Sequence, residues 1–499
     1  MNKLLPIALS LALFVQPLVA QTASTPSPDL STSQAEQDFF GTDQPTVEKA
    51  KKDQYDPTLA FTSQGVSWGG VLYDKVEWDG GWIGDWPHPW SLSDNWNDSV
   101  NFTLNNIFYM DSRPNKNFRV HVALVSNWPF TNTLINASTG LPTTVPTVRI
   151  WELFSDVSLD NSILIRFGKQ EADWGVGYFY SAGDVLSLSS IDPTNPTAER
   201  EGPVALKVSV PFPNQRADFS LFTVAPDSLF NPTVSTVGAP SPTFRDLAYA
   251  AKGDLAWNGV QWSLSGYYQR DESKKLVASA SGGLGWIPLS FAKDVNWFTE
   301  QIAAYGSDRW IGSGSQNLNG MTTFAVLSRP WQYYFSNVSG IFYTNSEYNA
   351  SFRVEYYYNG EGSNDQGYAQ KLYNAYFTEL SNPGSYSSAF GPATTLGTND
   401  IVYPGVHNLT ALLTFTTLAN SKFDASALLQ QNFSDGSGWI RPLLTYNFND
   451  YFSLYAGFQV VWGQNGTQFP LQFLTYSTST PQTQRVNLVL GGQIGSSRY

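Results

Sequence analysis

The sequence of 499 residues contains no cysteine, only three histidines and only 14% charged residues. Without thiols the chain cannot form disulfides or a cysteine-ligated metal site, which excludes a small secreted domain built on disulfides. Acidic residues outnumber basic ones, so the formal net charge is -13. Because a nucleic-acid-binding protein needs a basic surplus to neutralise phosphates, we expect no nucleic-acid partner.

Long apolar runs are also missing. After the first residues, no stretch approaches the roughly 18 to 20 consecutive apolar residues that a membrane-spanning helix requires. The start of the chain differs: Lys3 precedes an apolar stretch from Leu4 to Pro17, and small residues follow before Gln21. This pattern is typical of a secretory signal peptide over residues 1–20. A secreted chain without a helical span can still cross a membrane, but only as a closed β-barrel.

Aromatic residues and glycine are abundant. The chain has 15% aromatic residues, 40 glycines and 17 tryptophans, a composition typical of an all-β protein rich in turns. Residues 21–58 are rich in Ser, Thr, Pro and charge, and we interpret them as a disordered periplasmic lead-in. The remaining residues, 59–499, form the predicted β domain.

The clearest strand signals lie between residues 161 and 216. Ile163, Ile165 and Phe167 alternate with polar or small residues, and an equally alternating segment starts at Gly202. A period of two places alternate side chains on opposite faces, so each strand has one apolar face. A long polar connection joins these two strands, whereas their outer ends have tight turns. Alternation of short turns with long loops is typical of an outer-membrane β-barrel.

The same alternation continues along most of the chain and predicts about 18 antiparallel strands, with 16 as the alternative. The dipeptide Asn258-Gly259 between two alternating segments indicates a hairpin. An even strand number places both termini on the periplasmic side, where the tight turns then fall. Within residues 360–403, Tyr368, Leu372, Tyr376 and Leu380 recur every fourth position and predict an amphipathic helix, which caps the pore or packs against another loop.

The apolar faces are expected to contact lipid, with aromatic residues concentrated near strand ends. In the first predicted strand, Asp74 falls on the lipid face, so we expect it near the rim or a bulge at Gly69-Gly70. The opposite faces collect charges of both signs, which would select solutes in a watery interior or pair with each other. The candidate pore-lining residues are Arg119, Glu152, Arg166, Lys207, Arg353, Glu355 and Arg441.

The long connection after Gln170 contains a second group of charged residues. These side chains either form a constriction inside the barrel or remain solvated outside it. The candidates are Glu171, Asp173, Glu199, Arg200 and Glu201.

The segment from Phe167-Gly168-Lys169-Gln170 through Trp174-Gly175-Val176-Gly177 to Glu199-Arg200-Glu201-Gly202 resembles a pattern of porin-like and alginate-export-like outer-membrane barrels. In those proteins a strand ending in Gly-Lys-Gln leads into a Trp-Gly loop. The resemblance implies 18 strands and passive passage of sugars or other small solutes. Exporters of anionic polymers carry an arginine surplus inside, whereas the charges inferred for this interior are balanced.

Catalytic and cofactor signals are few, and we expect neither an enzyme nor a cofactor or metal. His121 is predicted to face inward, unlike the histidine of an outer-membrane lipid hydrolase. A secreted carbohydrate-binding or carbohydrate-cleaving β-sandwich would also explain the aromatics, and a transporter of hydrophobic compounds would need an apolar interior. The expected partners are outer-membrane lipid, the barrel-assembly machinery and small hydrophilic solutes. The predicted chain is a monomer or homotrimer in the bacterial outer membrane.

Overall fold

The computed structural model describes residues 65–83, 96–115, 117–127, 131–135, 142–146, 148–159, 162–172, 174–187, 191–196, 200–226, 243–288, 292–318, 320–381, 404–418, 421–475 and 482–495. The chain divides into two compact units, Met1–Ala50 and Lys51–Tyr499, and every described residue belongs to the second. The predicted signal peptide and the predicted lead-in over residues 21–58 lie outside the described residues.

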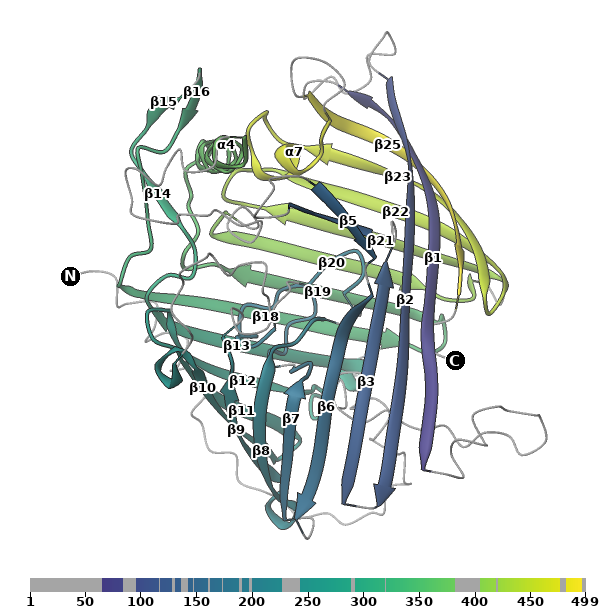
Figure 1. Cartoon of the computed structure of the whole chain (residues 1–499). Helices are drawn as coiled ribbons and strands as arrows, with labels where there is room; N and C mark the ends of the chain where they lie inside the picture. The colour runs from purple at the N-terminus through teal and green to yellow at the C-terminus, as the bar shows by residue number, and fades with distance from the viewer. Residues whose placement is uncertain are drawn as a thin grey trace. The chain divides into compact units, whose positions relative to one another are not determined.

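Eighteen antiparallel strands form one closed sheet (Figure 1). Each strand pairs with the next one in the ring, and the last pairs with the first, so the ring has no free edge. In ring order the strands are β1(Val66–Ile83), β2(Trp96–Asn115), β3(Phe118–Asn127), β6(Arg149–Leu159), β7(Ile163–Lys169), β8(Val204–Phe212), β9(Ala217–Val224), β10(Ala248–Trp257), β11(Val260–Tyr268), β12(Lys274–Gly283), β13(Val295–Tyr305), β18(Tyr333–Asn345), β19(Ala350–Tyr358), β20(His407–Phe415), β21(Phe423–Asn432), β22(Gly438–Asn449), β23(Phe452–Trp462) and β25(Gln482–Ile494).

The closed ring of 18 strands confirms the predicted fold class and strand number, and the 16-strand alternative is wrong. A single sheet closed on itself also contradicts the β-sandwich alternative, which needs two separate sheets packed face to face. The structure contains no helix long and apolar enough to span a bilayer among the residues it describes.

Alternation of side chains explains why these segments form strands. Along β3, Arg119, His121, Ala123 and Val125 are buried on the inner face, and the residues between them are more exposed. On the outer face, large apolar side chains are left uncovered, including Phe167, Leu221, Leu264 and Leu490. In water this exposure would be costly, whereas hydrocarbon is a favourable surrounding for these side chains. Exposed aromatics near strand ends, such as Trp257, Tyr333 and Tyr451, follow the predicted distribution.

Tight turns join the strands at one end of the barrel. Asn258 and Gly259 have positive φ angles of 53° and 75°, as the predicted two-residue hairpin requires. The turn between β8 and β9 contains the 3-10 helix η1(Pro213–Gln215) and ends at Arg216 in the left-handed region, with φ 51°. One connection at this end is longer than predicted for a periplasmic turn: residues 284–294 between β12 and β13 include η5(Ala292–Asp294).

Secondary structure within the long connections lies at the opposite end. It comprises the β4(Thr131–Ile135)–β5(Pro142–Pro146) hairpin, η4(Phe244–Asp246), β14(Ile311–Ser313), β15(Gln316–Leu318), β16(Met321–Thr323), β17(Val326–Ser328), α4(Tyr368–Ser381), α7(Gln468–Gln472) and β24(Leu474–Thr475). Helix α4 confirms the predicted amphipathic helix. Its Leu372 and Ala375 pack against Phe324 and Leu327 of the β13–β18 connection, so it contacts another loop, and it also contacts α7 (Figure 1).

Asp74 occupies the outer face of β1, as expected, and is opposite Ile494, the last residue of β25. On the β25 side Asp74 is therefore level with the strand end, as expected for a rim position, but on the β2 side it lies in mid-strand opposite Leu104. Its Oδ1 is buried and has no hydrogen-bond partner among the described residues. The alternative explanation, a bulge at Gly69-Gly70, is wrong because the β1–β2 register runs without a shift from Val66 to Trp82.

Candidate functional site in the barrel interior

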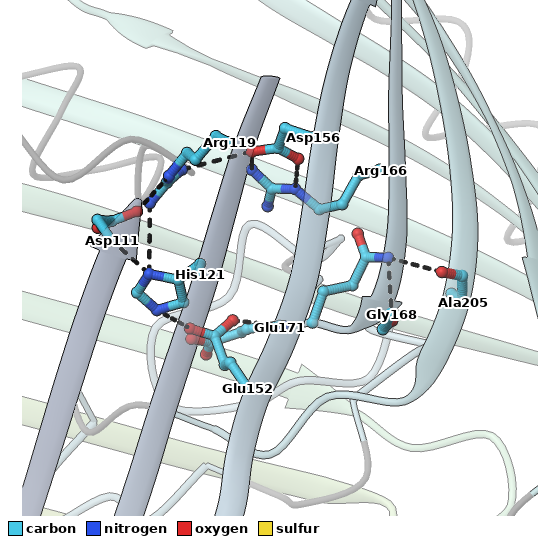
Figure 2. A network of polar contacts seen from close by, with 10 residues as sticks. Asp111, Arg119, His121, Glu152, Asp156, Arg166, Gly168, Glu171 and Ala205 are labelled. Atoms are coloured by element: carbon cyan, nitrogen blue, oxygen red, sulfur yellow. Dashed lines mark hydrogen bonds and ion pairs between the residues drawn. The ribbon is translucent and has the colours of Figure 1, made fainter. Parts of the chain in front are cut away.

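A row of charged side chains crosses the inner faces of β2, β3, β6 and β7 (Figure 2). Arg119 Nε donates to Asp111 Oδ1 at 2.5 Å, and its Nη1 lies 3.5 Å from Asp156 Oδ2. Arg166 donates to both oxygens of the same Asp156, at 2.7 and 3.2 Å. Because adjacent strands present these residues at matching heights, positive and negative side chains alternate along the row. Pairing holds the guanidinium groups in fixed positions on the wall.

His121 lies beside this row, between two carboxylates. Its Nδ1 is 3.3 Å from Asp111 Oδ2, and its Nε2 is 3.3 Å from Glu152 Oε2 (Figure 2). An ionised carboxylate only accepts hydrogen bonds, so this position favours an imidazole that carries a proton on both nitrogens. Glu152 Oε1 in turn accepts a hydrogen bond from the backbone N–H of Glu171, at 3.0 Å. The wall network therefore continues into the start of the β7–β8 connection, at Glu171.

A second charged network joins β1 to β22 and β23, across the inner face of the last strand, β25. Glu77 on β1 pairs with Lys75 at 2.7 Å and with Arg441 on β22 at 2.8 Å. The hydroxyl of Tyr455 on β23 donates to the same carboxylate, also at 2.8 Å. Tyr455 crosses the inner face of β25 to reach Glu77, at the position of Gly491. A Cβ atom at Gly491 would lie 2.2 Å from the Tyr455 ring, so only glycine leaves the required space.

The β7–β8 connection, residues 170–203, folds into the barrel interior. Its base is closed by a backbone hydrogen bond from Gln170 to Pro203 O and by the Gln170 side chain, which donates to Ala205 O at 2.9 Å. Two ion pairs add to the base: Lys169 with Glu201, and Arg200 with Asp184, the latter at 2.5 Å. Glu171 accepts the backbone N–H of Arg200 at 2.9 Å. We call residues 170–203 the inner loop.

The far side of the inner loop is bound to a single carboxylate on another wall. Glu355 of β19 accepts the backbone N–H groups of Tyr178, Phe179 and Tyr180, at 2.8 to 3.1 Å. Glu355 is 1% exposed and Phe179 is also 1% exposed. The inner loop leaves the ring between the fifth and sixth strands and is held at the thirteenth. It therefore crosses the interior toward the opposite wall.

Further contacts attach the inner loop to the neighbours of β19. Glu300 of β13 accepts the backbone N–H of Val176 at 3.0 Å and is fully buried. A Cβ atom on Gly183 would lie 2.2 Å from the Glu300 carboxylate, so glycine allows this close approach. Thr410 of β20 donates to the hydroxyl of Tyr180 at 2.8 Å. Strands β13, β19 and β20 thus provide the docking wall, with β18 between β13 and β19.

Apolar contacts hold the other side of the inner loop. Ala172, Trp174 and Leu186 form a buried cluster with Phe222 of β9 and Ala250 of β10. The rings of Trp174 and Phe222 meet edge to face at 5.2 Å, and the Lys207 ammonium lies 5.4 Å from the Phe222 centroid. Burial of these side chains inside a barrel with a polar wall supports a defined loop conformation.

Arg353 lies where the inner loop meets the docking wall. Its guanidinium is 3.9 Å from the ring centroid of Tyr178 and 4.2 Å from that of Phe342. Two aromatic faces restrict the motion of the side chain and favour its positive charge. A cation held by two aromatic rings therefore lies where the inner loop meets the docking wall.

The structure brings the predicted residues together in three groups. Arg119, Glu152 and Arg166 belong to the β2–β7 network; Arg441 belongs to the β1–β23 network; Lys207, Arg353 and Glu355 contact or adjoin the inner loop. Of the predicted constriction residues, Glu171, Arg200 and Glu201 form the base of the inner loop, while Asp173 and Glu199 lie outside the described residues.

Sequence reasoning missed several residues that the structure places in these groups. Glu77, Asp111, Tyr178 and Glu300 were not selected as candidates. A useful signal for Glu300 exists: it is the one charged residue within Val295–Tyr305, at the strand centre. For Tyr178 the sequence signal is weaker: it is one of several aromatic residues that lie between the glycines of the inner loop.

The two histidines in the described part of the chain do not have the surroundings expected of the catalytic histidine of a lipid hydrolase. His121 contacts two carboxylates on the inner face, and His407 Nδ1 lies 2.6 Å from the Tyr356 hydroxyl. No group of three or more His, Asp or Glu side chains suited to a metal ion occurs among the described residues.

Comparisons with known proteins give structural similarity only. No protein-family model matches the chain, and no curated protein matches it. Among solved structures, Acinetobacter baumannii OccAB3 has a TM-score of 0.44 at 8% identity, covering 87% of this chain and 99% of that one. Pseudomonas aeruginosa OccK11 (OpdR) has a TM-score of 0.42 at 9% identity, covering 86% and 96%. Pseudomonas aeruginosa OpdK with vanillate has a TM-score of 0.43 at 8% identity, covering 87% and 98%. At this level of similarity the comparisons carry no inference about the solute, and the expected resemblance to alginate-export-like barrels in particular stays a prediction.

Proposed function

We propose that this chain is a bacterial outer-membrane channel for the passive diffusion of small hydrophilic solutes, with the inner loop as its constriction. The observation that carries the proposal is the inner loop itself, which leaves the wall at β7 and is bound by Glu300 and Glu355 on the far side. A closed barrel of this strand number encloses an aqueous interior unless it is filled. A loop docked across that interior limits the size of what can pass.

The charges of the wall support selection by charge as well as by size. Arg119, Glu152, Arg166, Lys207, Arg353 and Arg441 are proposed to line the pathway, and Glu355 to hold the constriction in place. Opposite charges alternate along the wall, so a neutral polar solute or a zwitterion can exchange hydrogen bonds with water for hydrogen bonds with the wall. Sugars and oligosaccharides are the solutes we propose on this basis.

Single-channel recording tests the proposal. The mature protein is refolded into a planar bilayer, and conductance steps, reversal potential in a salt gradient, and block by added sugars are measured. We expect discrete steps, weak ion selectivity because the wall charges are balanced, and concentration-dependent block by a permeating sugar. Absence of steps from a correctly folded barrel would overturn the channel proposal.

A cysteine variant tests the constriction separately, because the chain has no cysteine of its own. Tyr178→Cys places a thiol on the inner loop, and Leu490→Cys places one on the exposed outer face of β25. Addition of a charged thiol reagent to the aqueous phase should lower the conductance of the Tyr178 variant and leave the Leu490 variant unchanged. Equal responses would contradict the placement of the constriction at the inner loop.

A further inference from the structure

On the outer face of β12, β13 and β18, small and polar side chains take the place of large apolar ones at mid-strand. Thr299 and Gln301 flank Glu300, the central residue of β13, and so point outward. Asn337 and Ser339 are their cross-strand neighbours on β18. On the β12 side, the outward neighbours are the small residues Ala278 and Ala280. We call these six residues the polar patch.

Hydrogen bonds within the polar patch satisfy most, but not all, of its groups. Thr299 and Ser339 share a hydrogen bond between hydroxyl groups at 2.7 Å, and Ser339 donates to Asn337 Oδ1 at 3.1 Å. Asn337 donates to the Glu300 carbonyl at 3.1 Å, and Gln301 Nε2 donates to Thr299 at 3.1 Å. Among the described residues, no donor is found for the Gln301 carboxamide oxygen.

Comparable positions elsewhere on the wall carry large apolar side chains. Phe167 on β7 is 60% exposed, Leu264 on β11 is 56% exposed and Leu490 on β25 is 51% exposed. Aromatic residues return at both ends of the polar patch, with Tyr305 and Tyr333 in contact at one end and Trp297 at the other. The polar patch is therefore an interruption of the lipid-facing surface at the depth where hydrocarbon is least able to solvate an amide.

We propose that the polar patch is the surface through which two copies of this chain associate in the membrane, an inference that rests on the proposed membrane location and not on channel activity. Lipid tails offer no hydrogen-bond partner to Gln301. A second copy offers carboxamide and hydroxyl groups that both donate and accept, so the polar patch complements itself. The small residues Ala278 and Ala280 allow the two walls to approach closely, as small residues do at contacts between membrane helices.

Other occupants fit less well. A soluble protein cannot reach mid-height on a membrane-embedded wall. The polar patch has no charged side chain, which disfavours a charged lipid headgroup. Hydrogen-bonding side chains are favourable at a protein–protein contact in hydrocarbon because they find partners there.

Crosslinking in native outer membranes tests the association. Gln301→Cys and Ala278→Cys place a thiol in the polar patch, and Leu490→Cys places one on a distant part of the outer wall that is more exposed than Gln301. A bis-maleimide crosslinker is added, and the product mass is compared with multiples of the mass of the uncrosslinked mature chain. We expect the two patch variants to give several-fold more crosslinked self-complex than the Leu490 variant.

A second measurement separates folding from association. Gln301→Leu restores an apolar surface, so we expect it to shift the detergent-solubilised protein from oligomer to monomer mass, with heat-modifiable gel mobility unchanged. The proposal is overturned if the patch variants crosslink no more than Leu490→Cys, if they crosslink only to a different protein, or if Gln301→Leu leaves the mass unchanged. Each of these results can be obtained whether or not the barrel conducts ions.

Discussion

Gly491 shows how one residue decides a contact across the closure of the barrel. The missing side chain leaves room for Tyr455 to reach Glu77 over β25. Gly491→Val should expel the Tyr455 ring and break its hydrogen bond, at a cost of about 1–3 kcal/mol for overpacking in addition to about 1 kcal/mol for the lost bond. Unfolding in urea, followed by heat-modifiable mobility, measures the change.

The neighbouring glycine provides the control. Gly492 faces the other side of the sheet, where a Cβ atom would lie 3.1 Å from a methyl group of Leu454. Because the Leu454 side chain is 44% exposed on the outer face and can yield, Gly492→Ala should change the stability by less than about 1 kcal/mol. If both substitutions destabilised the protein equally, the contact with Tyr455 would not be the reason why glycine is needed at position 491.

Glu355 is the residue on which the position of the inner loop depends most. Glu355→Gln replaces one acceptor oxygen with an amino group, which faces backbone N–H groups that also donate. Each amide left unpaired in this buried site costs about 1–3 kcal/mol. We expect the inner loop to leave the docking wall part of the time, visible as increased open-channel noise in single-channel recordings. Glu347→Gln makes the same chemical change in the exposed β18–β19 turn, away from the inner loop, so quiet recordings from that variant serve as the comparison.

Pairing of strands could be predicted from the sequence, whereas the contacts between distant walls could not. The period of two, the Asn258-Gly259 turn and the spacing of Tyr368, Leu372 and Tyr376 are local signals, and they predicted the strands and helix α4. Glu77 contacts Arg441 because of the way the strands tilt around the closed ring. The sequence of a single strand does not determine that tilt. Binding of the inner loop by Glu300 and Glu355 uses backbone donors, whose positions follow from the fold and not from residue type.

At the scale of elements, the β13–β18 connection is tied to the wall by Asp308. Asp308 pairs with Lys275 of β12, and its backbone N–H donates to Glu361 at 3.2 Å. Burial alone would raise the pKa of the Asp308 carboxyl, but the Lys275 ammonium outweighs burial and holds the pKa below its ordinary value.

Acid should therefore release this connection before the barrel opens. A lowered pKa in the folded state means that the stabilisation is present above the unfolded-state pKa, about 3.9 for Asp, and is lost as the pH falls through the folded-state value. Hydrogen exchange should show residues 306–332 losing protection below about pH 4 while the strands keep theirs. Asp308→Asn should lose the same protection at neutral pH, whereas Asp271→Asn, at an exposed ion pair, should not.

At the scale of the whole molecule, the wall and the inner loop are separable parts. Closure of the ring rests on strand pairing and on the Glu77 network, none of which involves the inner loop. Because β7 and β8 are adjacent and antiparallel, a short Gly-Ser turn can replace residues 172–200 and still join them. The shortened chain should keep its heat-modifiable mobility and show a larger single-channel conductance with weaker block by sugars. An unchanged conductance would place the constriction elsewhere, with the connections that contain α4 and α7 as the next regions to shorten. Failure to fold would mean that the inner loop is part of the core of the barrel.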